Sequence, residues 1–201
     1  GLLACGFAAW ALAAAPAAHA ATVETAAPQA ILVDLGTNTV LMKKDEGATI
    51  QPASMSKLML LYMLFERLAD GGLTMEDTFA VSEKAWRMGG SKMFVGVNTR
   101  VSVADLLRGI IVQSGNDACI VVAEALASSE LAFAQLMTDR GLELGLRHSV
   151  FKNSTGWPEE GHVMSVWDIA FLSIRIIRDF PQYYRLFSEE SFTYNEIRQT
   201  N

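Results

Sequence analysis

The chain has 201 residues, of which 51% are hydrophobic and 19% are charged, with 16 Lys and Arg against 22 Asp and Glu. This length suits one domain with a sizeable core, and the apolar content and the formal net charge of −6 exclude a disordered chain. The acidic balance argues against a nucleic-acid-binding surface, and two cysteines, Cys5 and Cys119, cannot form a disulfide framework.

Residues 1–20 contain no charged side chain and are rich in alanine and leucine. The apolar run stops at Ala18-His19-Ala20, where small residues occupy both positions that a signal peptidase recognises. We therefore expect residues 1–20 to be a secretory signal peptide, clipped before its basic start, and the chain to be exported. A lipoprotein site at Cys5 and a short buried helix are the alternatives. Export implies an oxidising compartment, where Cys119 is expected to be a small core residue.

Two strands are expected at 30–34 and 39–42, joined by a turn at 36–38. An apolar stretch then runs from Leu58 to Leu68, and its first eight residues are all apolar. Because every face of this segment is apolar, it predicts a helix that is buried on all sides. The helix is expected to end at Gly71-Gly72, and it is too short to span a bilayer.

The rest of the chain has mainly helical patterns. Ser102-Val-Ala-Asp105 and Ser165-Val-Trp-Asp168 both resemble the capping box that begins a helix. The expected helices run from 102 towards 113, from 117 to 127, from 130 to 144, and from 165 to 178. Two strands followed mainly by helices indicate an α/β (α+β) fold rather than a regular series of βαβ units.

The first candidate catalytic motif is Ser54-Met-Ser-Lys57. On a helix, a spacing of three residues places two side chains on one face, about 5–6 Å apart at their β carbons. Serine becomes a good nucleophile when a base takes its proton, and a lysine is such a base when burial lowers its pKa. Lys57 opens the most apolar helix, and Pro52-Ala53 places Ser54 at the helix N-terminus, where amide donors stabilise negative charge. Ser149-Val-Phe-Lys152 repeats the pattern but leads into turn residues, so no helix is expected to hold its geometry.

Ser114-Gly115-Asn116 lies at the joint between two predicted helices. A hydroxyl and a carboxamide that project from one tight turn offer a proton relay and a partner for a substrate amide. Taken alone, the segment is explained more simply as an ordinary helix joint, with Asn116 or Ser114 as the N-cap.

Together, Pro52-Ala-Ser54-Met-Ser-Lys57 and Gln113-Ser114-Gly-Asn116-Asp-Ala118 resemble the motifs of penicillin-recognising serine enzymes, whose signature combines S-x-x-K, S-x-N and K-T-G. The resemblance is to the D-alanyl-D-alanine carboxypeptidases, the low-molecular-mass penicillin-binding proteins, in particular. It covers about residues 28 to 201 and includes further stretches at 31–34, 91–94, 107–110 and 192–199.

This resemblance implies a serine-type D-Ala-D-Ala carboxypeptidase that removes the terminal D-alanine from peptidoglycan stem peptides. It implies that Ser54 is the acyl-ester nucleophile, Lys57 the proton acceptor, Ser114 a proton relay and Asn116 a substrate-binding residue. Stem peptides and β-lactams are the implied partners, in the periplasm or at the outer face of the cytoplasmic membrane. No cofactor, metal or nucleic acid is expected.

One departure from the family pattern is the absence of Lys-Thr-Gly or Lys-Ser-Gly from the sequence. The implied fold is β-lactamase/transpeptidase-like, with an antiparallel sheet packed against a helical region. In the family the third motif lies on a strand beyond the helices, so we expect residues 21–201 to be a catalytic domain truncated before that strand. The usual C-terminal β domain and membrane-surface helix would also be missing, and association with the inner-membrane surface would require such a segment.

Other chemistries are less well supported. His148 and His162 lack metal-ligand spacing and are expected to be partly exposed loop residues. A class A β-lactamase needs a glutamate that activates the deacylating water, and neither Glu159 nor Glu160 stands in the Glu-x-x-Leu-Asn setting of that family. A β-lactamase, an endopeptidase of the same fold and a catalytically inactive cell-wall-binding protein are the alternatives.

Overall fold

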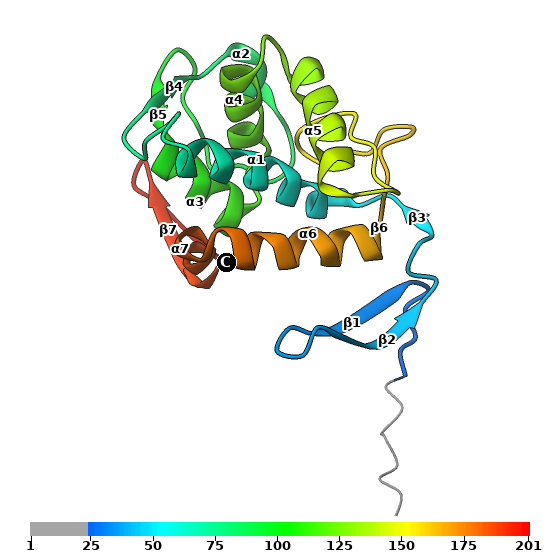
Figure 1. Cartoon of the computed structure of the whole chain (residues 1–201). Helices are drawn as coiled ribbons and strands as arrows, with labels where there is room; N and C mark the ends of the chain where they lie inside the picture. The colour runs from blue at the N-terminus through cyan, green and yellow to red at the C-terminus, as the bar shows by residue number, and fades with distance from the viewer. Residues whose placement is uncertain (1–23) are drawn as a thin grey trace, which may run out of the picture.

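The computed structural model describes residues 24–201, so the expected signal peptide at 1–20 lies outside the described residues. The helices gather around α1 (Lys57–Ala69), the apolar helix that the sequence predicts. On one side of α1, α6 (Val166–Asp179) separates it from a hairpin of β1 (Ala30–Asp34) and β2 (Thr39–Lys44) (Figure 1). The mixture of helices and strands agrees with the α+β prediction.

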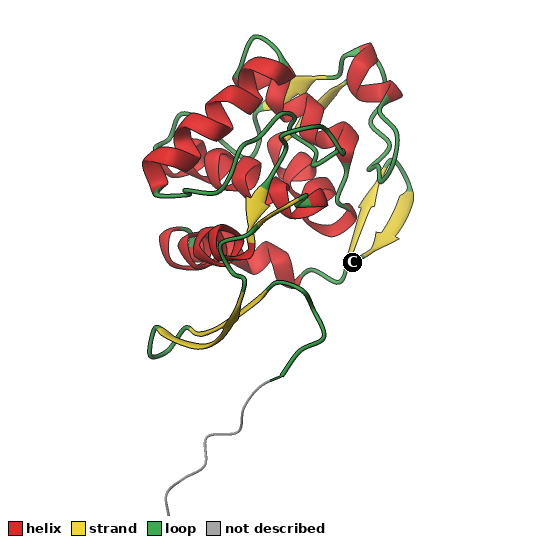
Figure 2. Cartoon of the chain, turned by 90° about the vertical axis from the view of Figure 1, so that its right-hand side faces the viewer, coloured by secondary structure: helices red, strands yellow, loops and turns green. Residues whose placement is uncertain are grey.

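In the described part of the chain, all four strand pairings are antiparallel: β1 with β2, β3 with β6, β4 with β5, and β7 with β8. Within residues 24–201 they form separate two-stranded sheets around the helices (Figure 2). The β3–β6 pair places Thr49 opposite Ser165, so it joins the segments that lead into η1 and α6. The remaining strands are β3 (Thr49–Ile50), β4 (Thr78–Ala80), β5 (Arg100–Ser102), β6 (Met164–Ser165), β7 (Ser191–Tyr194) and β8 (Ile197–Thr200).

The long helices begin and end close to the predicted residues, because short-range contacts set their ends. Ser102 and Ser165 are N-caps whose hydroxyls accept from the backbone N–H three residues later, at 3.1 Å in both cases. Gly145 ends α5 in the left-handed conformation, with φ +106°. The remaining helices are η1 (Ala53–Ser56), α2 (Glu83–Arg87), α3 (Val103–Gln113), α4 (Asn116–Leu126), α5 (Glu130–Leu144), α7 (Pro181–Tyr184) and η2 (Arg185–Ser188).

The hydrophobic core is built around α1. Its Met59, Leu60, Leu64 and Phe65 are fully buried, and each such side chain contributes roughly 1.5–3 kcal/mol by leaving water. Cys119 on α4 is also fully buried, as expected of a small core residue. Among the described residues, no single helix is long and apolar enough to cross a bilayer; α4 and α5 satisfy that criterion only as a pair bent by 83°.

Candidate active site

Ser54 lies on a short 3-10 turn, η1, which connects β3 to α1. Its side chain is exposed, whereas Ser56 is fully buried and donates to the Ala53 carbonyl at 3.0 Å. Ala53 has a φ of +49°, a left-handed conformation that costs a residue with a β carbon about 1–2 kcal/mol. The surrounding structure therefore holds Ser54 outward on a strained turn.

Lys57 occupies the first position of α1 and is only 4% exposed. Its Nζ lies 2.9 Å from Ser54 Oγ and donates to the Thr155 carbonyl at 2.6 Å. Burial lowers the pKa of Lys57, while the neighbouring Cys119 acts in the opposite direction. A lowered pKa increases the neutral fraction of the amine, and a neutral amine has a lone pair that can accept the Ser54 hydroxyl proton.

The loop 153–157 supplies the carbonyl that holds Lys57, and it folds around one carboxamide. Asn153 Oδ1 accepts from the backbone N–H of Thr155, Gly156 and Trp157, at 2.9–3.2 Å, and from the Thr155 hydroxyl at 3.1 Å. Gly156 has a φ of +82° and packs directly against Ala53, the residue before Ser54. The sequence predicts only turn residues in this stretch, because a backbone carbonyl that contacts a side chain 98 positions away leaves no signal in the sequence.

Ser114 and Asn116 lie where α3 meets α4, and neither of them is an N-cap: Ser114 is the C-cap of α3, and Gly115 is the N-cap of α4. Ser114 is left-handed, with φ +53°, and its buried Oγ has no hydrogen-bond partner among the described residues. Asn116 Nδ2 donates to the Gly89 carbonyl at 3.0 Å. Gly90, the next residue, lies against both Asn116 and Trp157, so the S-x-N segment and the loop 153–157 border one region.

The second Ser-x-x-Lys pattern forms no comparable pair. Ser149 donates its hydroxyl to Asp168 at 2.7 Å, and Lys152 is exposed. The two glutamates considered for a β-lactamase lie nearby: Glu159 accepts from Asn153 Nδ2 at 3.1 Å, and Glu160 is exposed. Ser54 and Lys57 are therefore the serine–lysine pair that this structure brings together.

Comparison with known proteins assigns the chain to a family. The profile of the D-alanyl-D-alanine carboxypeptidase family matches residues 14–201. The chain belongs to this family. It is 35% identical over 198 residues to D-alanyl-D-alanine carboxypeptidase DacC of Escherichia coli strain K12, covering 93% of this chain and 50% of the relative. It is 35% identical over 175 residues to D-alanyl-D-alanine carboxypeptidase DacF of Bacillus subtilis strain 168, covering 87% of this chain and 44% of the relative.

Solved structures agree with this assignment. The crystal structure of penicillin binding protein 5 from Haemophilus influenzae superposes with a TM-score of 0.85 at 34% identity, covering 89% of this chain and 53% of that chain. The penicillin-binding-protein fold that the two motifs imply is therefore confirmed. The chain spans about half the length of the curated relatives it matches.

In this family member, a buried carboxylate fixes the loop beside the S-x-N segment. Asp117 is fully buried, and its Oδ1 accepts from the N–H of Met93 and Ala118 at 2.9–3.0 Å. Its Oδ2 accepts from the N–H of Phe94 and Val95 at 2.9–3.1 Å. Because α4 carries both Asp117 and Asn116, this anchoring also sets the position of the loop relative to Asn116.

We expect Asp117→Asn to destabilise the protein strongly. An asparagine presents an NH₂ group to two of these backbone donors, and each unsatisfied buried donor costs about 1–3 kcal/mol, so the expected loss is about 2–6 kcal/mol. Urea denaturation measures it. Asp139→Asn is the control, since Asp139 is bonded only to Gln135 on the exposed face of α5 and should change stability by less than about 0.5 kcal/mol. Equal stability of the two variants would contradict the anchoring role.

The expectation for His162 is wrong, because this residue is 2% exposed. An antiparallel bridge between Val150 and Val163 folds its segment back on itself, so His162 Nδ1 accepts from the Lys152 N–H at 3.3 Å. The ring also packs edge-on against Phe151, and burial lowers the pKa of His162. His148 is exposed, as expected. Residues 24–201 contain no group of three or more His, Cys, Asp or Glu side chains that could hold a metal ion.

Proposed function

We propose that the protein is a serine-type D-Ala-D-Ala carboxypeptidase that removes the terminal D-alanine from peptidoglycan stem peptides. The observation that carries the proposal is the 2.9 Å contact between an exposed serine hydroxyl, Ser54, and a buried amine, Lys57, whose pKa is lowered by burial. Membership of the D-alanyl-D-alanine carboxypeptidase family supports the choice of substrate. The apolar segment 1–20 supports export to the periplasm or the outer face of the cytoplasmic membrane.

In the proposed mechanism, Ser54 Oγ attacks the carbonyl carbon that links the two D-alanines, and its proton passes to Lys57 Nζ. The C–N bond then breaks, and Ser114 relays a proton to the departing amine of D-alanine. Asn116 orients the substrate amide through its carboxamide. Water hydrolyses the Ser54 ester and returns the hydroxyl to its starting state. β-Lactams acylate the same serine because they resemble the dipeptide.

The test is to incubate the full-length protein with a fluorescent penicillin and to locate the adduct by mass spectrometry. We expect one adduct, on Ser54, together with release of D-alanine from an acylated peptide ending in D-Ala-D-Ala. An adduct on Ser149, or no adduct at all, would overturn the assignment of the nucleophile. Rapid penicillin hydrolysis without D-alanine release would instead favour a β-lactamase.

A further inference from the structure

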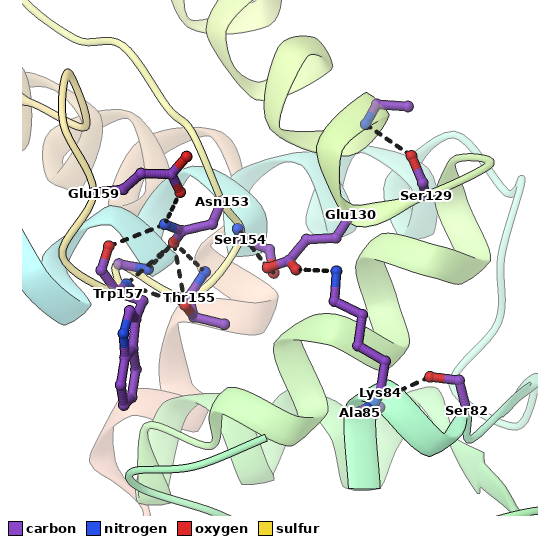
Figure 3. A network of polar contacts seen from close by, with 12 residues as sticks. Ser82, Lys84, Ala85, Ser129, Glu130, Asn153, Ser154, Thr155, Trp157 and Glu159 are labelled. Carbon is purple, nitrogen blue, oxygen red and sulfur yellow. Dashed lines mark hydrogen bonds and ion pairs between the residues drawn. The ribbon is translucent and has the colours of Figure 1, made fainter. Parts of the chain in front are cut away.

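A network of polar contacts centred on Glu130 links the loop 153–157 to two helices that lie outside the Ser-x-x-Lys and Ser-x-Asn motifs (Figure 3). Glu130, the first residue of α5, accepts at Oε1 from the Ser154 N–H at 3.1 Å and from the Ser154 hydroxyl at 2.8 Å. Its Oε2 lies 2.7 Å from Nζ of Lys84, on α2. Ser154 is fully buried, and only 11% of the Glu130 side chain is exposed.

Both helical ends of this link are fixed by their own caps. The Ser129 hydroxyl accepts from the Ala132 N–H at 3.1 Å at the start of α5, so the backbone beside Glu130 is held (Figure 3). The Ser82 hydroxyl accepts from the Ala85 N–H at 3.0 Å and holds the start of α2 in the same way. The carboxylate therefore projects from a rigid element towards the loop, and the loop is the part that it positions.

The residue that follows Ser154 carries the carbonyl that contacts the candidate base. The Thr155 carbonyl accepts from Lys57 Nζ at 2.6 Å, and Asn153 closes the loop on itself but connects it to no helix. Glu130, in contrast, connects the loop to α5 and, through Lys84, to α2. Hydrogen bonds to a charged acceptor are stronger than neutral ones, which suits a carboxylate to this anchoring.

We infer that Glu130 is a positioning residue for Lys57. By bonding Ser154, Glu130 fixes the position of the Thr155 carbonyl, which accepts one N–H of the Lys57 amine. With that N–H engaged, the lone pair of the neutral amine points at Ser54. This inference rests on the proposed function. A base that must face its nucleophile loses rate when its orienting partner moves, and a displacement of about 1 Å costs up to about 100-fold. The carboxylate acts through its Oε1 acceptor, and its charge pairing with the half-exposed Lys84 is secondary.

The experiment measures penicillin acylation of the full-length protein by stopped flow, which separates the acylation rate constant from the non-covalent dissociation constant. We expect Glu130→Ala to lower the rate constant about 10–100-fold and to change the dissociation constant less than about threefold. Glu130→Gln keeps an acceptor for both Ser154 donors and should restore the rate to within about threefold of wild type. Lys84→Ala should have an equally small effect.

Two further variants separate positioning from a general loss of stability. Ser154→Ala removes one of the two hydrogen bonds to Glu130 with little change in volume, so it reports on the link even if Glu130→Ala does not fold; we expect a smaller fall in the rate constant. Glu66→Ala is the control for stability: it breaks the ion pair between Glu66 on α1 and Arg140 on α5. Neither of these side chains bonds the loop 153–157, so this variant should leave the rate constant unchanged.

Three outcomes would overturn the inference, and a fourth would contradict the proposed function. A wild-type rate constant in both Glu130→Ala and Ser154→Ala would overturn the inference, and so would a Glu130→Gln variant as slow as Glu130→Ala. A fall in Glu66→Ala as large as that in Glu130→Ala would also overturn it, since the effect would then follow stability. Failure of the wild-type protein to be acylated at all would instead contradict the proposed function.

Discussion

Replacing Lys57 by arginine is expected to lower the rate of acylation by penicillin about 10²–10⁴-fold, the usual contribution of a general base. Lys57 Nζ lies 2.9 Å from Ser54 Oγ, and burial lowers its pKa below the ordinary value of 10.5. A guanidinium stays protonated and cannot accept the serine proton. In the wild-type protein, only the neutral amine is an acceptor, so acylation should fall as the pH drops below the pKa of Lys57.

The measurement is the acylation rate as a function of pH for the wild type and for Lys57→Arg. Lys152→Arg is the matched control, because Lys152 is the exposed lysine of the second Ser-x-x-Lys pattern and should be replaced without effect. Lys57→Met places an uncharged chain of similar length in the same buried site, so it separates loss of the base from the bulk of arginine. Acylation near the wild-type rate in both Lys57 variants would remove Lys57 from the mechanism.

Replacing Gly156 by alanine is expected to lower the stability of the protein and to abolish its acylation. A β carbon at this position would lie 1.9 Å from the Ala53 carbonyl oxygen and 2.7 Å from Ser56 Oγ, so one of the two backbone segments must move. The φ of +82° adds about 1–2 kcal/mol for a residue with a β carbon, and a forced shift in a packed site costs about 1–3 kcal/mol more. The segment that moves carries either Ser54 or the Thr155 carbonyl.

Gly71→Ala is the control for this variant. Gly71 has a similar φ of +76°, but a β carbon there would meet nothing within 4 Å, so only the backbone cost applies. Urea denaturation should show a loss of about 1–2 kcal/mol for Gly71→Ala and about 2–5 kcal/mol for Gly156→Ala. Only Gly156→Ala should lose acylation at a pH and temperature where both variants are folded. If both variants lost the same stability and kept the wild-type acylation rate, the close contact would be irrelevant to the site.

Much of the helical structure was predictable from the sequence because its determinants are local. The cap at Ser102 joins residues three apart, and the predicted helix at 130–144 coincides with α5. The hairpin of β1 and β2 was predictable for the same reason, since its turn lies between adjacent strands. The pairing of β3 with β6 was not predicted, because two residues from each of two distant segments leave no periodic pattern.

In the candidate site, too, the local features were predictable from the sequence and the long-range ones were not. The motif spacing predicted that Ser54 and Lys57 share a face, and the apolar helix behind Lys57 predicted the direction of its pKa shift. The prediction for His162 is wrong, because the burial of this side chain depends on a bridge between Val150 and Val163 rather than on its neighbours in sequence. A side chain's exposure is a property of everything that packs around it, and a single segment does not contain that information.

By itself, therefore, the sequence determined the long helices, the caps at Ser102 and Ser165, the two motifs and, through them, the family. The tertiary structure alone decided which groups surround the amine of Lys57. The Thr155 carbonyl comes from 98 residues away, and the carboxylate of Glu130 holds the loop that carries it. Spacing along a helix places two side chains side by side, because the helix repeat is regular. Orienting the lone pair of a base requires contacts from several segments at once, and only the packing of the whole chain brings those segments together.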